Sequence, residues 1–220
     1  MSKEIKSAIS DSLKKIKAEQ DMEVSLMADL LNIPISTFET YLYARNIPAL
    51  DMVVRICNQF DYPINDFFAS LGDKSSDQKQ IARIYSNFDM LPEIKRKQIY
   101  QMIEPLVQSM VEAMPDLKNA GFGQRIRILR EDIRMTLAEA ARSSNLQPDS
   151  LKVLESNQRL PSIATFLKLC ETFHVSPEYL LCNSLTYTFA VDKTLYALTP
   201  RELAALAESS YRLCRSVLDK

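Results

Sequence analysis

The stretch that decides the fold is residues 125–181, which read RIRILREDIRMTLAEAARSSNLQPDSLKVLESNQRLPSIATFLKLCETFHVSPEYLL. Apolar residues recur in it in short bursts at helical spacing, and turn signals separate the bursts. Thr136, with an acid three residues later, predicts a capping box at the second helix. The starts of the third, fourth and fifth helices are marked by Pro148, by Pro161 with Ser162, and by Pro177. Each helix is too short to be stable alone, so the five must be stabilised by packing against one another.

The pattern of this stretch occurs twice. A shift of 113 residues superposes residues 13–68 on residues 126–181 without a gap. The shift pairs apolar residues and turn residues of the same type at many positions, among them Leu13 with Ile126, Asn32 with Asn145, Pro48 with Pro161, Cys57 with Cys170 and Phe60 with Phe173. A chance match of this length is improbable, so we predict two copies of one module of about sixty residues.

The repeat divides the chain into four parts, and we expect an all-α fold throughout. Only 3 residues are Gly, which argues against hairpin-rich folds and phosphate-binding loops. Thr199 and Pro200 predict the start of a long C-terminal helix, whereas residues 185–198 allow either a hairpin or a helix. The expected parts are an N-terminal module at 1–72, a helical linker at 73–119, a second module at 120–182 and a helical appendage at 183–220.

Composition sets bounds on the class of protein. With 46% hydrophobic and 25% charged residues, the chain of 220 residues has the make-up of a globular protein. Neither a secretory signal nor an apolar stretch long enough to span a membrane is present, so we expect a cytoplasmic protein without membrane contact. The net charge of -1 means that any contact with DNA must come from local basic patches.

The sequence contains no recognisable catalytic or metal-binding motif. The four cysteines, Cys57, Cys170, Cys182 and Cys214, lack the spacing of a zinc or redox site and are expected to be reduced. The single histidine, His174, has no nucleophile or paired carboxylate beside it. We therefore expect that the protein is not an enzyme and that it uses no metal and no cofactor.

The second copy resembles the Cro/repressor-type (XRE, lambda-repressor-like) helix-turn-helix family over all five helices. Arg130, Thr136, Ala141 and Glu155 stand at the family's spacing. Asn145 and Asn157 occupy turn positions where the family often has Gly, and Asn is the side chain that best tolerates the left-handed conformation. The resemblance implies two tandem five-helix domains, with a partly buried ion pair between Arg130 and Glu155 in the second.

The family also implies which residues face DNA. The third helix of a module would lie in the major groove and the second would touch the phosphate backbone. In the second copy the implied DNA-facing residues are Thr136, Gln147, Asp149, Lys152, Val153, Ser156 and Arg159. In the first copy they are Ser36, Thr40, Tyr43 and Arg45, beside Ile35, Glu39 and Asn46.

Charge distinguishes the two copies. Residues 1–72 contain 7 basic and 10 acidic residues, whereas residues 122–182 contain 8 basic and 7 acidic residues. Asp149 and Glu39 would bring negative charge toward the groove, and Ala44 stands in a turn where the second copy has Asn157. The second copy is therefore the better candidate for DNA binding, and the first looks degenerate.

The hypothesis that follows is a nucleoid-associated, repressor-like transcriptional regulator that binds double-stranded DNA. Two unequal modules would read an operator that is an imperfect palindrome. Apolar rows on the linker and the C-terminal helix, including Ile99, Ile103, Leu203 and Leu206, further predict a homodimer. The alternative is a protein-interaction or antirepressor-like module whose DNA-reading face has degenerated.

Overall fold

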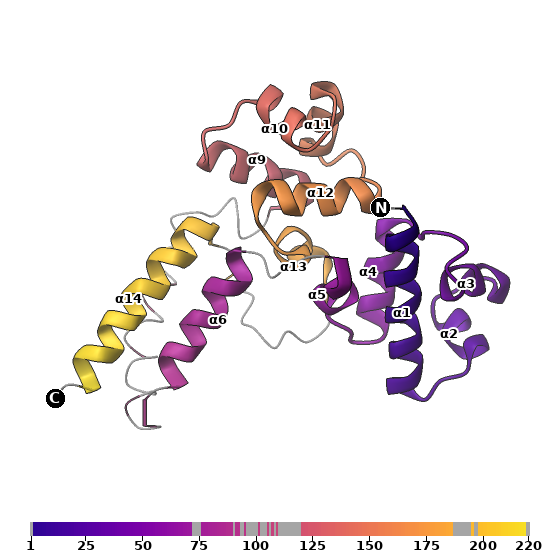
Figure 1. Cartoon of the computed structure of the whole chain (residues 1–220), viewed down its shortest axis with the longest axis horizontal. Helices are drawn as coiled ribbons and strands as arrows, with labels where there is room; N and C mark the ends of the chain where they lie inside the picture. Colours follow the sequence, from indigo (N-terminus) through magenta and orange to yellow (C-terminus); the bar gives the residue numbers. More distant parts are fainter. Residues whose placement is uncertain are drawn as a thin grey trace.

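The computed structural model describes residues 2–71, 76–89, 91–92, 95, 101, 105, 107, 109, 120–186, 195 and 198–218. These residues form α-helices and two short 3-10 helices, and no strand occurs among them, as the sequence predicts. Three bodies are visible in Figure 1: one of residues 2–71, one of residues 120–186 and a pair of long helices. We call the first two bodies the first unit and the second unit.

The first unit begins with a long helix whose apolar side is buried against shorter elements that follow it. Ile5, Ile9, Leu13 and Ile16 are buried along α1 at helical spacing. The elements are α1 (Ser2–Gln20), α2 (Val24–Leu30), α3 (Ile35–Leu42), α4 (Leu50–Gln59), α5 (Ile64–Phe67) and the 3-10 turn η1 (Ala69–Leu71). Phe38 and Phe67 are fully buried in this unit, so each short helix contributes to one core.

The second unit has the same succession of elements. They are α9 (Phe122–Asp132), α10 (Leu137–Ser143), α11 (Pro148–Glu155), α12 (Ile163–Phe173), α13 (Pro177–Leu181) and η2 (Cys182–Ser184). The predicted helix starts are confirmed: Thr136 and Ser162 cap α10 and α12 with their side chains, and Pro148 lies at the first turn of α11. Ser176 caps α13 in the same way.

The two units keep one register. The helices α2, α3, α4 and α5 begin 113 residues before α10, α11, α12 and α13, an offset that also separates η1 from η2. The left-handed residues follow the same rule, since the described non-glycine residues with positive φ pair as Asp21/Arg134, Asn32/Asn145, Ala44/Asn157 and Asp61/His174. We call two residues separated by this offset matched positions.

The remaining long helices pack on each other. α6 (Ser76–Asp89) lies alongside α14 (Pro200–Leu218), and Thr199 caps α14 as predicted. Buried Asn87 donates to the Ala207 carbonyl at 3.0 Å and to Ser210 Oγ at 2.9 Å, which fixes the register of the pair.

This packing changes one expectation on assembly. Leu203 and Leu206, which we expected to serve a homodimer, are buried, and their helix packs on α6 within the same chain. A second helix on the same chain is always close by, so it covers an apolar stripe more readily than another molecule does. The linker row Ile99, Ile103, Leu106 and Met110 and most of residues 185–198 lie outside the described residues.

The two units touch through their fifth helices. Asn65 on α5 donates from Nδ2 to Glu178 Oε2 at 2.6 Å, and the Glu178 backbone N–H donates to Asn65 Oδ1 at 3.1 Å. Phe68 packs on Phe166 beside this contact, with ring centroids 6.1 Å apart. Among the described residues, this contact lies between α5 and α13.

Candidate nucleic-acid interface

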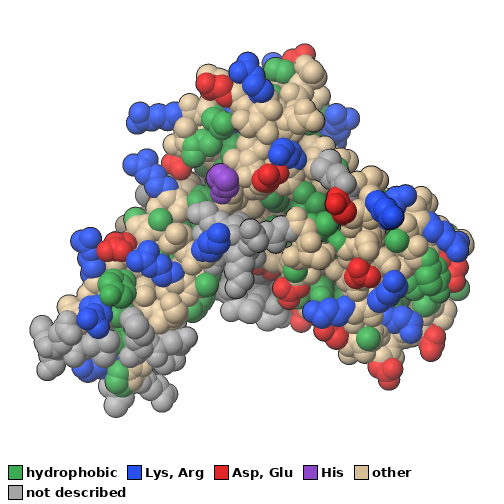
Figure 2. Space-filling view, viewed as in Figure 1, with side chains coloured by type: hydrophobic (Ala, Val, Ile, Leu, Met, Phe, Trp, Pro, Cys, Tyr) green, Lys and Arg blue, Asp and Glu red, His purple; other side chains and the backbone are tan. Residues whose placement is uncertain are grey.

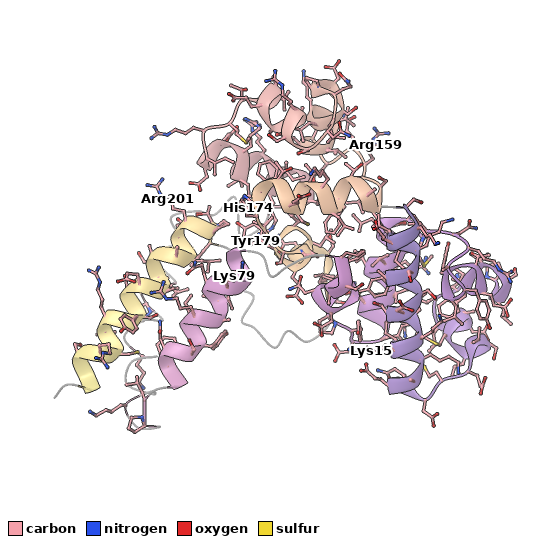
Figure 3. All side chains as sticks on the ribbon, in the orientation of Figure 1. Lys15, Lys79, Arg159, His174, Tyr179 and Arg201 are labelled. Carbon is pink, nitrogen blue, oxygen red and sulfur yellow. The ribbon has the colours of Figure 1, made fainter. Side chains whose placement is uncertain are left out.

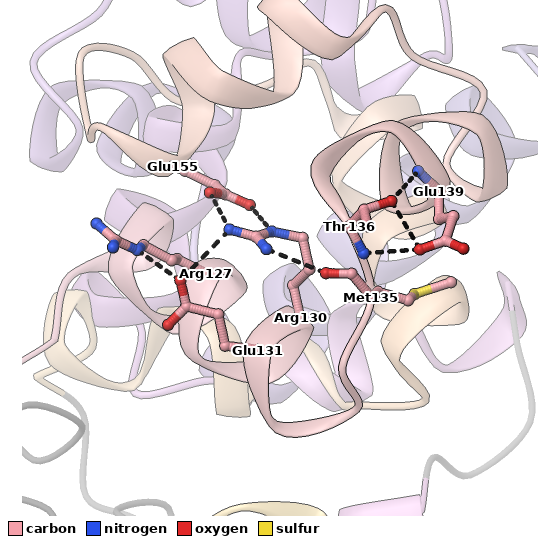
Figure 4. Close-up of polar contacts among 7 residues, drawn as sticks. All are labelled: Arg127, Arg130, Glu131, Met135, Thr136, Glu139 and Glu155. Carbon is pink, nitrogen blue, oxygen red and sulfur yellow. Dashed lines mark hydrogen bonds and ion pairs between the residues drawn. The ribbon is translucent and has the colours of Figure 1, made fainter.

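The geometry of the second unit depends on how α11 is held against α9. Arg130 reaches from α9 to the last residue of α11 with a two-pronged ion pair: Nε lies 2.6 Å from Glu155 Oε1 and Nη2 lies 3.0 Å from Oε2. A third donor, Nη1, binds the Met135 carbonyl at 3.1 Å (Figure 4). The partners that the family resemblance suggested are therefore in direct contact.

This pair is shielded from water. The Arg130 and Glu155 side chains are 13% and 9% exposed, so solvent screens their attraction only weakly. The hydrogen bonds from Arg130 to Glu155 raise the pKa of the guanidinium above its ordinary value. A charged pair that is bonded at both oxygens fixes the end of α11 in position and angle.

A close backbone approach adds a second link between the same helices. A Cβ at Gly123 would lie 2.0 Å from the Leu154 carbonyl oxygen, so only glycine permits this distance. Asn157, in the left-handed turn after α11, accepts a hydrogen bond from the Gly123 N–H at 2.6 Å. Together with the ion pair, these contacts make α9 and α11 one rigid element.

The start of α10 is closed by a reciprocal capping box. The Thr136 N–H and hydroxyl both donate to Glu139 Oε2 at 2.7 Å, and the Glu139 N–H donates to Thr136 Oγ1 at 3.3 Å (Figure 4). These bonds, above all the one from the hydroxyl, lower the pKa of the Glu139 carboxyl below its ordinary value. The Thr136 hydroxyl is thus already engaged, as is that of Ser156, which donates to the Val153 carbonyl at 2.8 Å.

The residues that we expected to face DNA are on the surface of the second unit. Lys152 is exposed on α11. Arg159 follows that helix in an exposed turn (Figure 3). Most of the set is exposed and Val153 is partly buried; the exposed members are Thr136, Gln147, Asp149, Lys152, Ser156 and Arg159. The arrangement offers two exposed cations, with Asp149 as a local negative charge at the start of α11.

The matching surface of the first unit is different in character. Ser36 is exposed, whereas Thr40 is partly buried and its hydroxyl donates to the Thr37 carbonyl at 2.7 Å. Tyr43 is exposed and its ring lies 5.8 Å from the guanidinium carbon of Arg45. Arg45 is the single basic residue between residues 21 and 46. This face therefore has much less to offer a phosphate backbone than the face of the second unit.

The comparison of matched positions reveals a residue that the sequence-based list missed. Arg142 is exposed in the last turn of α10, beside the turn into α11. Its match in the first unit is Asp29, and charge is reversed in the same sense at Asp21/Arg134, Asp29/Arg142 and Glu39/Lys152. The signal was present in the repeat, since aligning the two copies by charge rather than by apolar residues would have found it.

Other kinds of site have little support. Within the described ranges, no three His, Cys, Asp or Glu residues are placed to hold a metal ion. All four cysteines are buried, and burial, with a smaller contribution from Glu178, raises the pKa of the Cys57 thiol. His174 is exposed at the left-handed end of α12 (Figure 3). Of the helices that the structure describes, none is both long and apolar enough to cross a bilayer.

Comparison with known proteins identifies one part of the chain. Residues 123–183 match the family model for a helix-turn-helix domain. The match covers α9 to α13 and η2, which are the elements of the second unit. Neither the curated proteins nor the solved structures give a significant match.

Proposed function

We propose that this chain, which carries a helix-turn-helix domain at residues 123–183, is a repressor-like transcriptional regulator that reads DNA with α10 and α11 of its second unit. One observation carries the proposal: exposed Arg142, Lys152 and Arg159 accompany a helix that the Arg130–Glu155 pair holds rigidly. A recognition helix must be held in this way because base contacts depend on position to within a fraction of an ångström.

The roles of the side chains follow from helix-turn-helix geometry. With α11 in the major groove, Lys152 and Arg159 would donate to guanine O6 and N7 or to phosphates, and Val153 would meet a thymine methyl group. Arg142, at the end of α10, would bind the phosphate backbone. Gln147 at the N-cap of α11 has no side-chain capping bond and is free to reach a base edge.

We further propose that residues 1–72 and 120–182 are two copies of one module, joined by a helical linker at 73–119 and followed by an appendage at 183–220. The shared register of helices and left-handed residues supports this reading. The bond between Asn65 and Glu178 supports it independently. In a pair related by a two-fold axis, matched positions meet at that axis, so this contact is the one expected if the copies form an intramolecular pseudo-dimer.

The operator follows from this arrangement. If Ser36, Thr40, Tyr43 and Arg45 of the first unit also contact DNA, the chain spans two unequal half-sites and the operator is an imperfect palindrome. If the first unit does not contact DNA, a homodimer of the whole chain is the alternative source of a second reading helix. Such a dimer would use the linker helices or the exposed side of α14 around Tyr211. Light scattering separates the two cases, since the pseudo-dimer alone keeps the mass of 25.1 kDa at all concentrations.

The test is binding to DNA sequences selected from a random pool, followed by variants. Lys152→Ala, Arg159→Ala and Arg142→Ala should each weaken binding, and loss of a phosphate contact should reduce the salt slope by about 1. Lys168→Ala is the control, because Lys168 on α12 is paired with Glu171 at 2.8 Å and lies outside α10 and α11. The proposal fails if Arg45→Ala abolishes binding while the changes at Lys152 and Arg159 have no effect.

A further inference from the structure

The surface of α2 and α3 combines features that a DNA-reading face does not have. Leu26 is 47% exposed, Leu30 is 41%, Ile35 is 45% and Tyr43 is 54%. These are four of the seven large apolar residues that are exposed in the described part of the chain. Figure 2 shows apolar side chains gathered over α2 and α3, with both acidic and basic side chains around them. We call these four residues the α2–α3 patch.

Three acidic residues lie beside the α2–α3 patch. Glu23 is exposed at the start of α2, Asp29 is exposed within α2, and Glu39 is partly exposed on α3. None of the ion pairs between described residues uses these three carboxylates. Arg45, beside Tyr43, and Lys6, which donates to the Arg45 carbonyl at 2.7 Å, are basic residues at the Tyr43 end of the patch. The rest of the rim is negative and available to a partner of opposite charge.

The fold does not require this chemistry. In the second unit the matched positions of the patch carry Glu139, Ser143, Pro148 and Ser156, and the same helices form there. The residues of the patch are thus dispensable for packing, and exposed apolar side chains in a cluster are unfavourable in water unless something covers them. The charge reversal at Asp29/Arg142 and Glu39/Lys152 points the same way, since the first unit has carboxylates, which repel phosphate, where the second unit has cations.

We infer that the α2–α3 patch docks a basic amphipathic helix of a partner protein. An apolar row at helical spacing on the partner would cover Leu26, Leu30 and Ile35, and its Lys or Arg residues would meet the acidic rim. The first unit would then recruit a protein, a role separate from DNA binding by the second unit.

The chemistry selects this occupant over others. A phosphate backbone and an anionic membrane surface are both repelled by Glu23, Asp29 and Glu39. A second copy of the same patch brings like charges together. A basic amphipathic helix is favoured because it covers the apolar side chains and brings opposite charge to the acidic residues at the same time.

The probe is a pair of synthetic amphipathic peptides of about five helical turns, with one leucine face and either lysine or glutamate on the flanks. Binding to the full chain is measured by fluorescence anisotropy at low and high salt. The lysine peptide should bind at least about tenfold more tightly than the glutamate peptide, and salt should reduce the difference. Equal binding of the two peptides would overturn the inference.

Variants locate the binding surface. The double change Leu26→Glu and Leu30→Ser introduces the side chains of the second unit, and Glu39→Lys reverses the charge on the rim. Each change should weaken binding of the lysine peptide roughly tenfold. Neither should lower the melting temperature of the chain, because the side chains are exposed. Ile133→Ser, an equally exposed apolar residue outside the patch, is the control and should leave binding unchanged.

Two further results would contradict the inference. If sedimentation finds a concentration-dependent dimer that the Leu26 and Leu30 changes abolish, the occupant is a second copy of this chain. Loss of DNA binding in the same variants would mean that the patch is part of the DNA-reading surface. DNA binding that persists unchanged while the lysine peptide is lost supports separate roles for the two units.

Discussion

Asn65 and Glu178 lie 113 residues apart and bind each other through both a side-chain and a backbone donor. Their helices, α5 and α13, begin at the same offset, so each residue meets its own matched position. Glu178 is 7% exposed, and a buried carboxylate needs hydrogen-bond donors around it. The contact therefore holds the two units in one arrangement.

Removing the amide should destabilise the chain. Asn65→Ala deprives buried Glu178 of two hydrogen bonds, and we expect a loss of about 1–3 kcal/mol in the free energy of unfolding. Gln158→Ala, in an exposed turn, should change it by less than about 0.5 kcal/mol. Chemical denaturation measures both. An Asn65→Ala effect as small as that of Gln158→Ala would mean that water replaces the amide at this contact.

Breaking the Arg130–Glu155 pair should cost more stability than breaking the contact between Asn65 and Glu178. Glu155→Ala leaves a largely buried guanidinium without its main partner, and we expect a cost of ~3–5 kcal/mol. Glu131→Ala is the control, since that carboxylate is 51% exposed and lies 3.6 Å from the same arginine. Its loss should cost no more than about 1 kcal/mol. Similar melting temperatures for the two variants would contradict the burial of the pair.

The two glycines at the start of α9 should respond differently to the same change. In Gly123→Ala the new Cβ meets the Leu154 carbonyl oxygen at 2.0 Å, so α9 and α11 must separate, at a cost of ~1–3 kcal/mol or more. In Gly121→Ala the nearest atoms are those of the Asn157 side chain at 3.2 Å, which can move aside. The melting temperature of Gly123→Ala should lie well below that of Gly121→Ala. The reverse order would show that α9 and α11 are not in close contact.

A stabilising change is available in the first unit. Ala44 has φ 57°, a conformation that costs a residue with a Cβ ~1–2 kcal/mol. Ala44→Gly relieves this cost, and we expect a gain in stability of about 1 kcal/mol after the greater flexibility of the unfolded chain is included. Ala138→Gly on α10 has ordinary helical geometry and should lose ~0.5–1 kcal/mol. Calorimetry that finds Ala44→Gly more stable and Ala138→Gly less stable than the wild type would support the left-handed conformation at Ala44. A loss of stability in both variants would refute it.

The capping box predicts a dependence on pH. The bonds from Thr136 lower the pKa of Glu139, so the folded state prefers the ionised carboxyl. This contribution to stability is complete above the pKa of the unfolded chain and is lost as pH falls through the lowered value. The difference in melting temperature between the wild type and Glu139→Gln should therefore be largest near neutral pH and shrink in acid. A difference that stays constant down to pH about 2 would contradict the bond.

Local features of the sequence determined the helices. Thr136, Pro148 and Ser162 begin their helices where predicted, because caps and prolines act within one turn of the backbone. The left-handed turns at Asn145 and Asn157 were predictable for the same reason. The repeat made the first unit predictable from the second, including the strained position at Ala44, and the family resemblance supplied the partners Arg130 and Glu155.

Only the tertiary structure decided what covers each surface. The periodicity of α14 showed an apolar stripe, but not that α6 of the same chain would cover Leu203 and Leu206. The contact between Asn65 and Glu178 and the close approach at Gly123 also join residues far apart in sequence. The α2–α3 patch was hidden in the same way, since Leu26 and Leu30 resemble core residues in the sequence and are exposed in the fold. Burial depends on which elements meet in space, and a periodic pattern specifies a face of a helix without specifying its neighbour.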